Sequence, residues 1–372
     1  MQKITEFLKK EAVLAVAFIL ALATSFIVKP DKTYISYIDF RTLGILLSLM
    51  LVMAGFKSLG IFGQIGEALV SKAKSEKGIA LILISLCFFF SMLITNDVAL
   101  ITFVPFTVIT LGLLERKDMY VIVIVLETVA ANLGSMLTPL GNPQNLYLYS
   151  LSGMGIKDFV LLMLPYSVVA YVLLVAAVLV FIRNRNRDKI TPKEYTRTSG
   201  ENFLIGIYLV AFAIALLVVL RVIPYEYGII TVLALVLLFD RKTLKDADYS
   251  LLFTFIFLFI FIGNIKRIPA LSETLEVMVS SNEVLVSAAL SQVISNVPAA
   301  VLCSGFTTEI DKLIVGTNIG GLGTLIASMA SLISYKLYAA TEDARVGKYI
   351  AVFTVTNILF LFCMAFTHFI MQ

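Results

Sequence analysis

Charged residues, histidine and paired cysteines are scarce in this chain. Asp, Glu, Lys and Arg make up only 15% of its 372 residues, whereas hydrophobic residues make up 59%. Soluble domains are typically about half apolar and about a quarter charged, so this is the composition of a membrane protein. Polar residues are confined to short connections, the longest at 183–201, which leaves no room for a separate soluble domain.

The missing side chains exclude several classes of function. Cys87, Cys303 and Cys363 lie in apolar stretches without the spacing of a disulfide framework or a metal site. The apolar segments contain no nucleophile–base pair, and the single histidine, His368, lies at the end of the last one, which argues against a membrane-embedded enzyme. Lys and Arg lie between the apolar runs, so the net charge of +4 does not indicate nucleic-acid binding. We predict no enzymatic activity, no organic cofactor and no nucleic-acid partner.

What the chain does contain is a series of long apolar runs, which makes the lipid bilayer its first expected partner. About 20 apolar residues are needed to cross the roughly 30 Å hydrocarbon core of a bilayer. The first run is long enough to span and many spans follow, so we interpret it as an uncleaved helix and not as a signal peptide. The predicted full spans are 12–28, 41–56, 119–153, 157–182, 202–222, 227–239, 249–265, 309–338 and 347–369.

Two other regions, 78–113 and 283–307, each consist of an apolar arm, an Asn-containing break and a second apolar arm. The arm at 81–94 amounts to about 21 Å of helix, which is too short to cross the membrane. We therefore predict two re-entrant helical hairpins with their tips at Asn96 and Asn296. The spans 119–153 and 309–338 are interrupted by Gly and Asn, and we predict that they are broken transmembrane helices.

The two chain halves share the order span, span, hairpin, broken span, span, and the helix at 202–222 is left over between them. Each half crosses the membrane four times, so the extra helix inverts the second half relative to the first. At a constant offset of 186 residues, Asn132 matches Asn318, Gly134 matches Gly320 and Thr138 matches Thr324. The predicted fold is an all-α polytopic membrane protein built as an inverted repeat. Its predicted parts are a first repeat at 1–182, a basic linker with a connecting helix at 183–226, and a second repeat at 227–372.

Basic residues predict the orientation in the membrane. Most of the 29 Lys and Arg residues fall in connections that this topology places on the same side as the N-terminus. Cytoplasmic connections are enriched in Lys and Arg, so we predict a multi-pass protein of the cell (inner) membrane with a cytoplasmic N-terminus and an external C-terminus. The stretch 57–77 is expected to form an amphipathic helix on the cytoplasmic surface, and 268–282 occupies the same place in the second half.

The breaks concentrate polar side chains at membrane depth, where irregular backbone is tolerated only if it is buried in protein or lines a watery cavity. Breaks at corresponding places in two chain halves indicate the binding site of a transporter. Free carbonyls at the end of a half-helix attract cations, and free amides at its start attract anions. Asn142 and Pro143 form a helix start signal, and we expect Thr324 to cap the corresponding half-helix. The amide side chains concerned are Asn96, Asn132, Asn142, Gln144, Asn145, Asn296 and Asn318.

Two acidic residues, Asp97 and Glu127, are placed deep in the membrane by this topology. An intramembrane carboxylate is costly and indicates a function. Asp97 lies beside Asn96 at the first tip, where it could hold a sodium ion or carry a proton, and where it could also cap the returning arm. Glu127 lies about one helical turn before Asn132, where a proton relay and a buried hydrogen bond are equally consistent with the sequence.

Four motifs carry these breaks. They are Thr95-Asn96-Asp97, then Asn132-Leu133-Gly134 with Gly141-Asn142-Pro143-Gln144-Asn145, then Ser295-Asn296-Val297-Pro298, and finally Gly316-Thr317-Asn318-Ile319-Gly320-Gly321. In these motifs the chain resembles the ion transporter superfamily, which includes arsenite permeases, NhaD-type sodium/proton antiporters, citrate carriers and divalent anion/sodium symporters. The resemblance covers nearly the whole chain and is closest to the bacterial and archaeal anion-transporter branch near the arsenite and citrate permeases.

The resemblance implies an inverted-repeat transporter, often a homodimer, in which the hairpins and broken helices move together in an elevator-like manner. With the breaks, it predicts a site for a small anionic substrate formed by Thr95, Asn96, Asn142, Asn145, Ser295, Asn296 and Thr324. The predicted ion-coupling residues are Asp97, Asn132, Gly141, Asn318, Gly320 and Glu127. Sodium is expected at Asn96, Asp97, Gly141 and Asn145, and at Asn296, Gly320 and Thr324.

The chain departs from the sodium-coupled anion carriers at its tips. Asp97 stands where those carriers have Thr, and Val297 occupies the matching place in the second tip. A carboxylate there disfavours a dicarboxylate site and favours coupling to protons or cations. Our leading hypothesis is a secondary active transporter of a small inorganic or carboxylate anion, coupled to sodium or protons. The alternatives are a sodium/proton antiporter that uses Asp97, an arsenite-type permease for a neutral hydroxide, and a channel, which would need a continuous pore.

Overall fold

The structure is a computed structural model that describes residues 11–182, 198–342 and 344–371. Over these residues it consists of helices and connections, with no β-strand. Eight of the described helices are long and apolar enough to cross a membrane, or nine if one bent pair counts as a single span. The prediction of an all-α polytopic membrane protein is confirmed. The basic stretch 183–197 of the predicted linker lies outside the described residues.

The unbroken spans that the sequence predicts are helices in the structure. They are α2 (Ala12–Ile27), α4 (Phe40–Ser58), α10 (Ile156–Phe181), α11 (Ser199–Val219), α12 (Tyr225–Phe239), α13 (Tyr249–Lys266) and α19 (Val346–Met371). Short helices join them: α3 (Thr33–Tyr37), α5 (Ile61–Val70), α14 (Pro269–Ser281), η1 (Lys117–Met119) and η3 (Arg241–Asp246). Local signals fix several helix starts; for example, Thr198 and Glu201 form a capping box at the start of α11.

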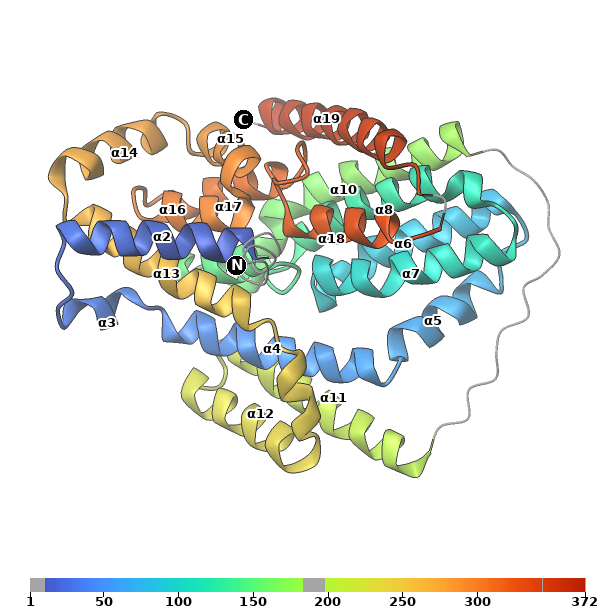
Figure 1. Ribbon diagram of the computed structural model, residues 1–372, viewed down its shortest axis with the longest axis horizontal. Helices are drawn as coiled ribbons and strands as arrows, with labels where there is room; N and C mark the ends of the chain where they lie inside the picture. Colours follow the sequence, from blue (N-terminus) through green and yellow to red (C-terminus); the bar gives the residue numbers. More distant parts are fainter. Residues whose placement is uncertain (1–10, 183–197, 343, 372) are drawn as a thin grey trace.

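Each predicted hairpin consists of two helices that meet at a single residue. The first joins α6 (Glu76–Ile94) to α7 (Asn96–Leu113) at Thr95, and the second joins α15 (Glu283–Ile294) to α16 (Asn296–Ser304) at Ser295. Both tip residues have a positive φ, +74° and +73°, a conformation that is uncommon for residues other than glycine. Figure 1 shows the first hairpin in the right half of the molecule and the second in the left half.

The first hairpin is longer than the sequence predicts. Its arms have 19 and 18 residues, and each is long and apolar enough to cross a membrane, so the argument from a short arm beginning at Leu81 is wrong. The difference arises at Glu76, which begins α6 but is only 1% exposed because it forms an ion pair with Arg116. This pairing joins distant parts of the chain, and the sequence does not show it. The second hairpin has shorter arms of 12 and 9 residues.

Both broken spans are confirmed. The first consists of α8 (Tyr120–Gly134), η2 (Ser135–Leu137) and α9 (Pro143–Ser152), and the second of α17 (Ile310–Ile319) and α18 (Met329–Ala339). Asn142 caps α9 by accepting a hydrogen bond from the Asn145 amide, and Pro143 takes the first helical position as predicted. The expectation that Thr324 caps the second half-helix is wrong, because α18 begins later, with Ser328 in the N-cap position.

Equivalent contacts in the two halves establish the repeat. The Thr138 hydroxyl donates to the Met92 carbonyl in the first half, and the Thr324 hydroxyl donates to the Gln292 carbonyl at 3.0 Å in the second. Thr138 and Thr324 are separated by the offset of 186 that the sequence predicts. In each half, the hydroxyl ties the connection inside the broken helix to the first arm of the hairpin.

The hairpin tips repeat a second contact. The Asn96 amide donates to the Gly141 carbonyl, and the Asn296 amide donates to the Ala327 carbonyl, both at 2.9 Å. Gly141 and Ala327 are again 186 residues apart. In each half, α6 packs along α8 and α15 packs along α17. Each hairpin is therefore fixed to the broken helix of its own half, and the two form one packed unit.

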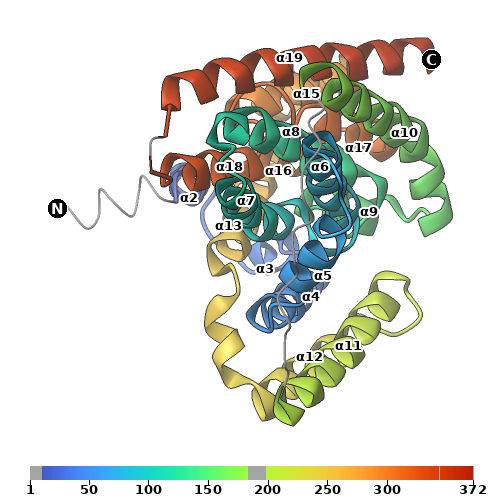
Figure 2. The ribbon, with the colours of Figure 1, turned by 90° about the vertical axis from the view of Figure 1, so that its right-hand side faces the viewer.

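Another group of helices packs beside these units. α4 contacts α11, α12 and η3, and α2 packs along α13. Figure 2 shows α11 and α12 below α4, standing apart from the hairpins and broken helices. This arrangement places α4 between the hairpin units and the α11–α12 pair.

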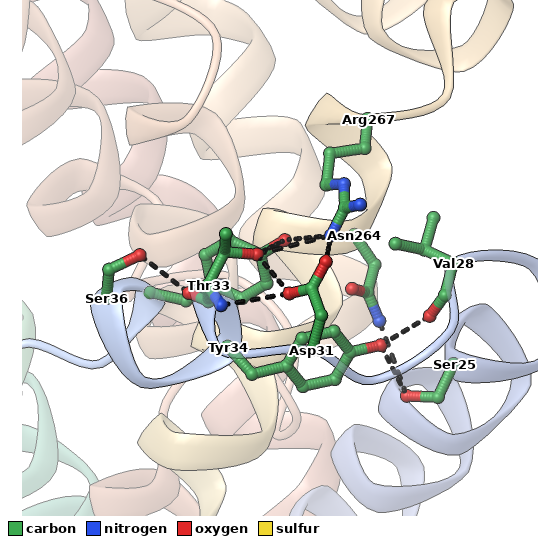
Figure 3. A network of polar contacts seen from close by, with 9 residues as sticks. Ser25, Val28, Asp31, Thr33, Tyr34, Ser36, Asn264 and Arg267 are labelled. Atoms are coloured by element: carbon green, nitrogen blue, oxygen red, sulfur yellow. Dashed lines mark hydrogen bonds and ion pairs between the residues drawn. The ribbon is translucent and has the colours of Figure 1, made fainter.

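The ends of α2 and α13 are joined by a polar network, which Figure 3 shows. Asn264 on α13 donates to the Ser25 hydroxyl at 3.4 Å, and Arg267 donates to Asp31 at 2.9 Å. Hydrogen bonds from Thr33 and Arg267 lower the pKa of the Asp31 carboxyl. The network fixes one end of the α2–α13 pair and lies away from the breaks.

Candidate functional site

The predicted asparagines of the two halves meet in one network, which we call the asparagine cluster. In the first half, Asn132 on α8 accepts a hydrogen bond from Asn96 at the hairpin tip, at 3.2 Å. In the second half, Asn318 on α17 accepts from Asn142 at 3.1 Å and donates to Asn145 at 2.6 Å. The cluster therefore joins the break of the first half to the broken helix of the second.

Two serines complete the cluster from the other side. The Ser328 hydroxyl donates to Asn132 at 2.9 Å, and Asn132 donates to the Ser331 hydroxyl at 3.2 Å. Ser328 and Ser331 lie 186 residues after Asn142 and Asn145, so they are the counterparts of these residues in the second repeat. The sequence analysis missed both serines, although its own offset leads to them. Each broken helix is tied to the break of the opposite half.

The cluster is buried, and part of its work is to satisfy the broken backbone. Its five asparagines are at most 4% exposed. The Asn145 side chain donates to the carbonyls of Ser135, Met136 and Thr138, which the end of the first half-helix leaves without helical partners. An unpaired buried carbonyl is costly. In this conformation Asn145 and Asn318 therefore stabilise the breaks and do not face open space.

A cavity of about 470 Å³ lies beside the first hairpin tip. Most of its wall is apolar and comes from α4, α7, α9 and α18. It extends to exposed residues at the end of α4 and before α13, so it connects the first tip with solvent at that end of the molecule. Its polar and charged lining residues are Lys57, Ser58, Thr95, Asp97, Asn142, Asp246 and Asp248.

Asp97 is the acidic residue that this cavity reaches at the tip. It lies in the first turn of α7, whose N-cap residue is Thr95, so the expectation that Asp97 caps the returning arm is wrong. Its Oδ1 atom is buried and has no hydrogen-bond partner among the described residues. The neighbouring Asn96 side chain binds the Asp97 backbone amide at 2.9 Å and leaves the carboxylate open. A carboxylate in this position can take up a cation or a proton.

The second tip is covered in this conformation. Ser295 and Asn296 are 1% and 4% exposed and do not line the polar cavity. Val297, which stands where the first tip has Asp97, is 5% exposed. The cavity beside the second hairpin is apolar, with a volume of about 400 Å³, and is bounded by α2, α13, α15 and α16. The structure thus opens one tip to a polar cavity and buries the other.

Glu127 lies apart from the asparagine cluster and the polar cavity. It is fully buried on α8, where the Thr107 hydroxyl of α7 donates to its Oε1 atom at 2.5 Å. Its Oε2 atom has no hydrogen-bond partner among the described residues. The structure therefore shows the buried hydrogen bond that the sequence allows. A proton relay through Glu127 stays a prediction.

The predicted sodium ligands are only partly brought together. The Gly141 carbonyl accepts the Asn96 amide, and the Gly320 carbonyl accepts the Gln292 side chain at 2.8 Å. Thr324 is exposed and contacts Gln292, not the asparagine cluster. Gln292 is a residue that the sequence analysis missed. Both carbonyls are engaged by protein donors in this conformation, and the sodium sites stay a prediction.

The comparison with known proteins identifies the family. Residues 4–310, which include both hairpins and the first broken helix, match the citrate transporter family CitMHS. The chain belongs to this family. It is 32% identical over 338 residues to an uncharacterized transporter from Methanocaldococcus jannaschii, which covers 90% of each chain. As a member of the citrate transporter family, it is a membrane transporter and not an enzyme.

Two further relatives agree with this assignment. The chain is 30% identical over 322 residues to the inner membrane protein YbiR from Escherichia coli, which covers 85% of this chain and 83% of that protein. It is also 30% identical over 139 residues to a silicon efflux transporter from Oryza sativa subsp. japonica, which covers 37% of this chain and 28% of that protein. The prediction of a multi-pass membrane transporter of the ion transporter superfamily is confirmed.

Proposed function

We propose that this member of the citrate transporter family is a secondary active transporter that moves a small anion, an inorganic oxyanion or a carboxylate, coupled to sodium or protons. The observation that carries the proposal is the position of Asp97. Its carboxylate lies in the wall of the polar cavity at the first tip, and its Oδ1 atom has no partner among the described residues. A charged group at membrane depth is costly and is retained for a function. We assign Asp97 as the coupling group.

Helix starts around the same cavity support an anionic substrate. α7 and α18 both begin beside the cavity, at Asn96 and Met329, and neither has a side-chain cap. The first amides of a helix lack helical partners and carry partial positive charge, which suits an anion. Thr95 and Asn142 add polar side chains to the same wall. The substrate would bind between the first tip and the start of α9.

The packing supports elevator-like movement. Each hairpin is fixed to the broken helix of its own half, and the asparagine cluster joins the two halves. These elements would move as one body. α4, with α11 and α12 packed against it, forms the opposite wall of the cavity and would stay fixed. A homodimer, as the family resemblance implies, would anchor the fixed helices in the membrane.

A second candidate function is cation/proton exchange. The cavity lining contains three carboxylates, Asp97, Asp246 and Asp248, but one basic residue, Lys57. This balance attracts cations and repels a multiply charged anion. An intermediate possibility is efflux of a weak oxyacid in its neutral form, a chemistry that the name of the silicon efflux relative suggests. All three versions use Asp97 as the group that binds the coupling ion.

A ligand screen tests the proposed function. A ligand that binds only the folded protein raises its stability, by about 2.7 kcal/mol at a concentration of 100 times its Kd. We expect that citrate, phosphate, arsenite or silicate raises the Tm of the purified protein in detergent, and that the rise depends on pH or on sodium in place of potassium. The Asp97→Asn variant is the matched control, in which this dependence should disappear.

The same screen separates the candidates. If sodium or pH alone raises the Tm and no oxyanion or carboxylate adds to it, cation/proton exchange replaces anion transport. If only the uncharged acids act, the substrate is a neutral hydroxide. The absence of any shift with these ligands and ions contradicts both proposals.

A further inference from the structure

Arg221 connects two parts of the molecule that otherwise stand apart. It lies in the turn between α11 and α12, and its guanidinium donates to the Gly153 carbonyl at 2.9 Å and to the Tyr149 carbonyl at 3.2 Å. It also lies over the Tyr149 ring, 5.3 Å from the ring centroid. Both carbonyls belong to the C-terminal end of α9, where the partial negative charge of the helix favours a cation.

The backbone at Arg221 gives an independent reason to assign it a role. Its φ is +61°, in the left-handed region that favours glycine. The turn ends α11 in a Schellman motif: the Arg221 amide donates to the Val218 carbonyl at 3.0 Å, and the Val222 amide donates to the Leu217 carbonyl at 2.9 Å. Glycine is the usual residue at this position. An arginine here is less favourable for the turn itself, and its side chain offsets that cost by binding α9.

The contact lies at the end of α12 opposite the opening of the polar cavity. α12 runs from Tyr225, just after the Arg221 turn, to Phe239, and η3 follows it. The cavity lining includes Asp246 and Asp248, which follow the far end of α12. Figure 2 shows that the α11–α12 pair otherwise stands apart from the hairpins and broken helices. The structure is therefore open at one end of α12 and bridged by Arg221 at the other.

We propose that Arg221 is a latch that holds α9 against the α11–α12 turn while the polar cavity is open at the opposite end, and that it releases in every transport cycle. The inference rests on the proposed alternating-access function, in which α9 moves with the hairpins and α11–α12 stay fixed. A contact made in one conformation but not in the other shifts the equilibrium toward the first. Loss of the latch therefore increases the population of the opposite conformation.

The turn itself supplies a variant that removes the latch without harming the fold. Arg221→Gly places the preferred residue in the Schellman motif and deletes the guanidinium. Glu115→Gly is the matched control, because Glu115 has a φ of +56° in the same kind of turn at the end of α7. There the Glu115 amide donates to the Gly112 carbonyl at 3.0 Å and the Arg116 amide to the Leu111 carbonyl at 2.8 Å.

A cysteine at the covered tip reports the opposite conformation. By the inverted repeat, Val297 takes the place in that conformation that Asp97 has here, so it becomes accessible when the first tip closes. Val297→Cys is introduced together with Cys363→Ser, because Cys363 is exposed whereas Cys87 and Cys303 are buried. The rate of labelling by membrane-permeant N-ethylmaleimide is then measured in native membranes, with denatured protein as the standard for full labelling.

We expect Arg221→Gly to raise the labelling rate of Val297→Cys by about tenfold, the effect of losing one hydrogen bond to a charged group. Arg221→Lys keeps the charge but not the paired geometry and should lie between. Glu115→Gly should match the parent. Equal rates in Arg221→Gly and the parent overturn the latch and leave the transporter proposal standing. If Val297→Cys stays unlabelled in every folded variant, alternating access itself is overturned.

Discussion

Replacement of Asp97 by Asn is expected to abolish the ion dependence of transport while the protein remains folded. The amide has nearly the shape of a carboxyl group but can neither release a proton nor attract a cation by charge. Asp97 Oδ1 has no hydrogen-bond partner among the described residues, so the substitution breaks no contact that the structure shows for it. Interactions of a charged group contribute ~1.5–3 kcal/mol, so gradient-driven uptake into proteoliposomes should fall about tenfold or more.

Asp246→Asn is the matched control for this experiment. Asp246 lines the same cavity but is exposed and lies far along the chain from the hairpin tip. The control should retain the pH and sodium dependence of the parent, with a change in apparent affinity at most. If Asp97→Asn responds to pH and sodium as the parent does, another group carries the coupling, and Glu127 becomes the first candidate.

Gly134→Ala is expected to destabilise the protein strongly. A Cβ atom at Gly134 would lie 2.1 Å from the backbone carbonyl oxygen of Phe88 and 2.7 Å from the Ser91 hydroxyl, so α6 must move away from α8. Overpacking typically costs about 1–3 kcal/mol. This exceeds the roughly 0.5–1 kcal/mol that Ala gains over Gly inside a helix. The Tm in detergent should therefore fall.

The inverted repeat supplies a second variant and a control for this prediction. At Gly320, the counterpart of Gly134, a Cβ would lie 2.7 Å from the Ala288 Cα atom, so Gly320→Ala should lower the Tm as well. Gly206 on α11 has no atom within 4 Å of the added Cβ, and Gly206→Ala should leave the Tm unchanged or raise it. Unaltered Tm values for both Gly134→Ala and Gly320→Ala would show that the hairpins do not pack on the broken helices at the distances described here.

The order of elements could be predicted from the sequence because local signals mark every break. Asn142 with Pro143 sets the start of α9, and the Asn-containing tips end the apolar runs abruptly. The length of the first hairpin could not be predicted in the same way. Glu76 is a charged residue that would normally end an apolar arm, but its burial depends on an ion pair with Arg116, 40 residues away.

The candidate site could be predicted where its residues are unusual for a membrane. Asparagines in apolar sequence are conspicuous, and the structure brings Asn96, Asn132, Asn142, Asn145 and Asn318 together. Serines that do the same work in the second half are common in helices and give no such signal. Arg221 was also hidden, since its meaning comes from the α9 carbonyls that it meets across the fold. The misplacement of the helix cap at Thr324 has a local cause, because a flexible Gly-rich connection does not fix where a helix resumes.

The central claim is that the hairpins and broken helices form a coupled transporter with Asp97 as its coupling group. The most direct test is to load proteoliposomes with the substrate found in the ligand screen and to impose a proton or sodium gradient. We predict that the substrate moves against its own concentration difference, that an ionophore stops this movement, and that Asp97→Asn cannot sustain it. Movement that always stops at equal concentrations, whatever the ion gradient, would contradict the claim.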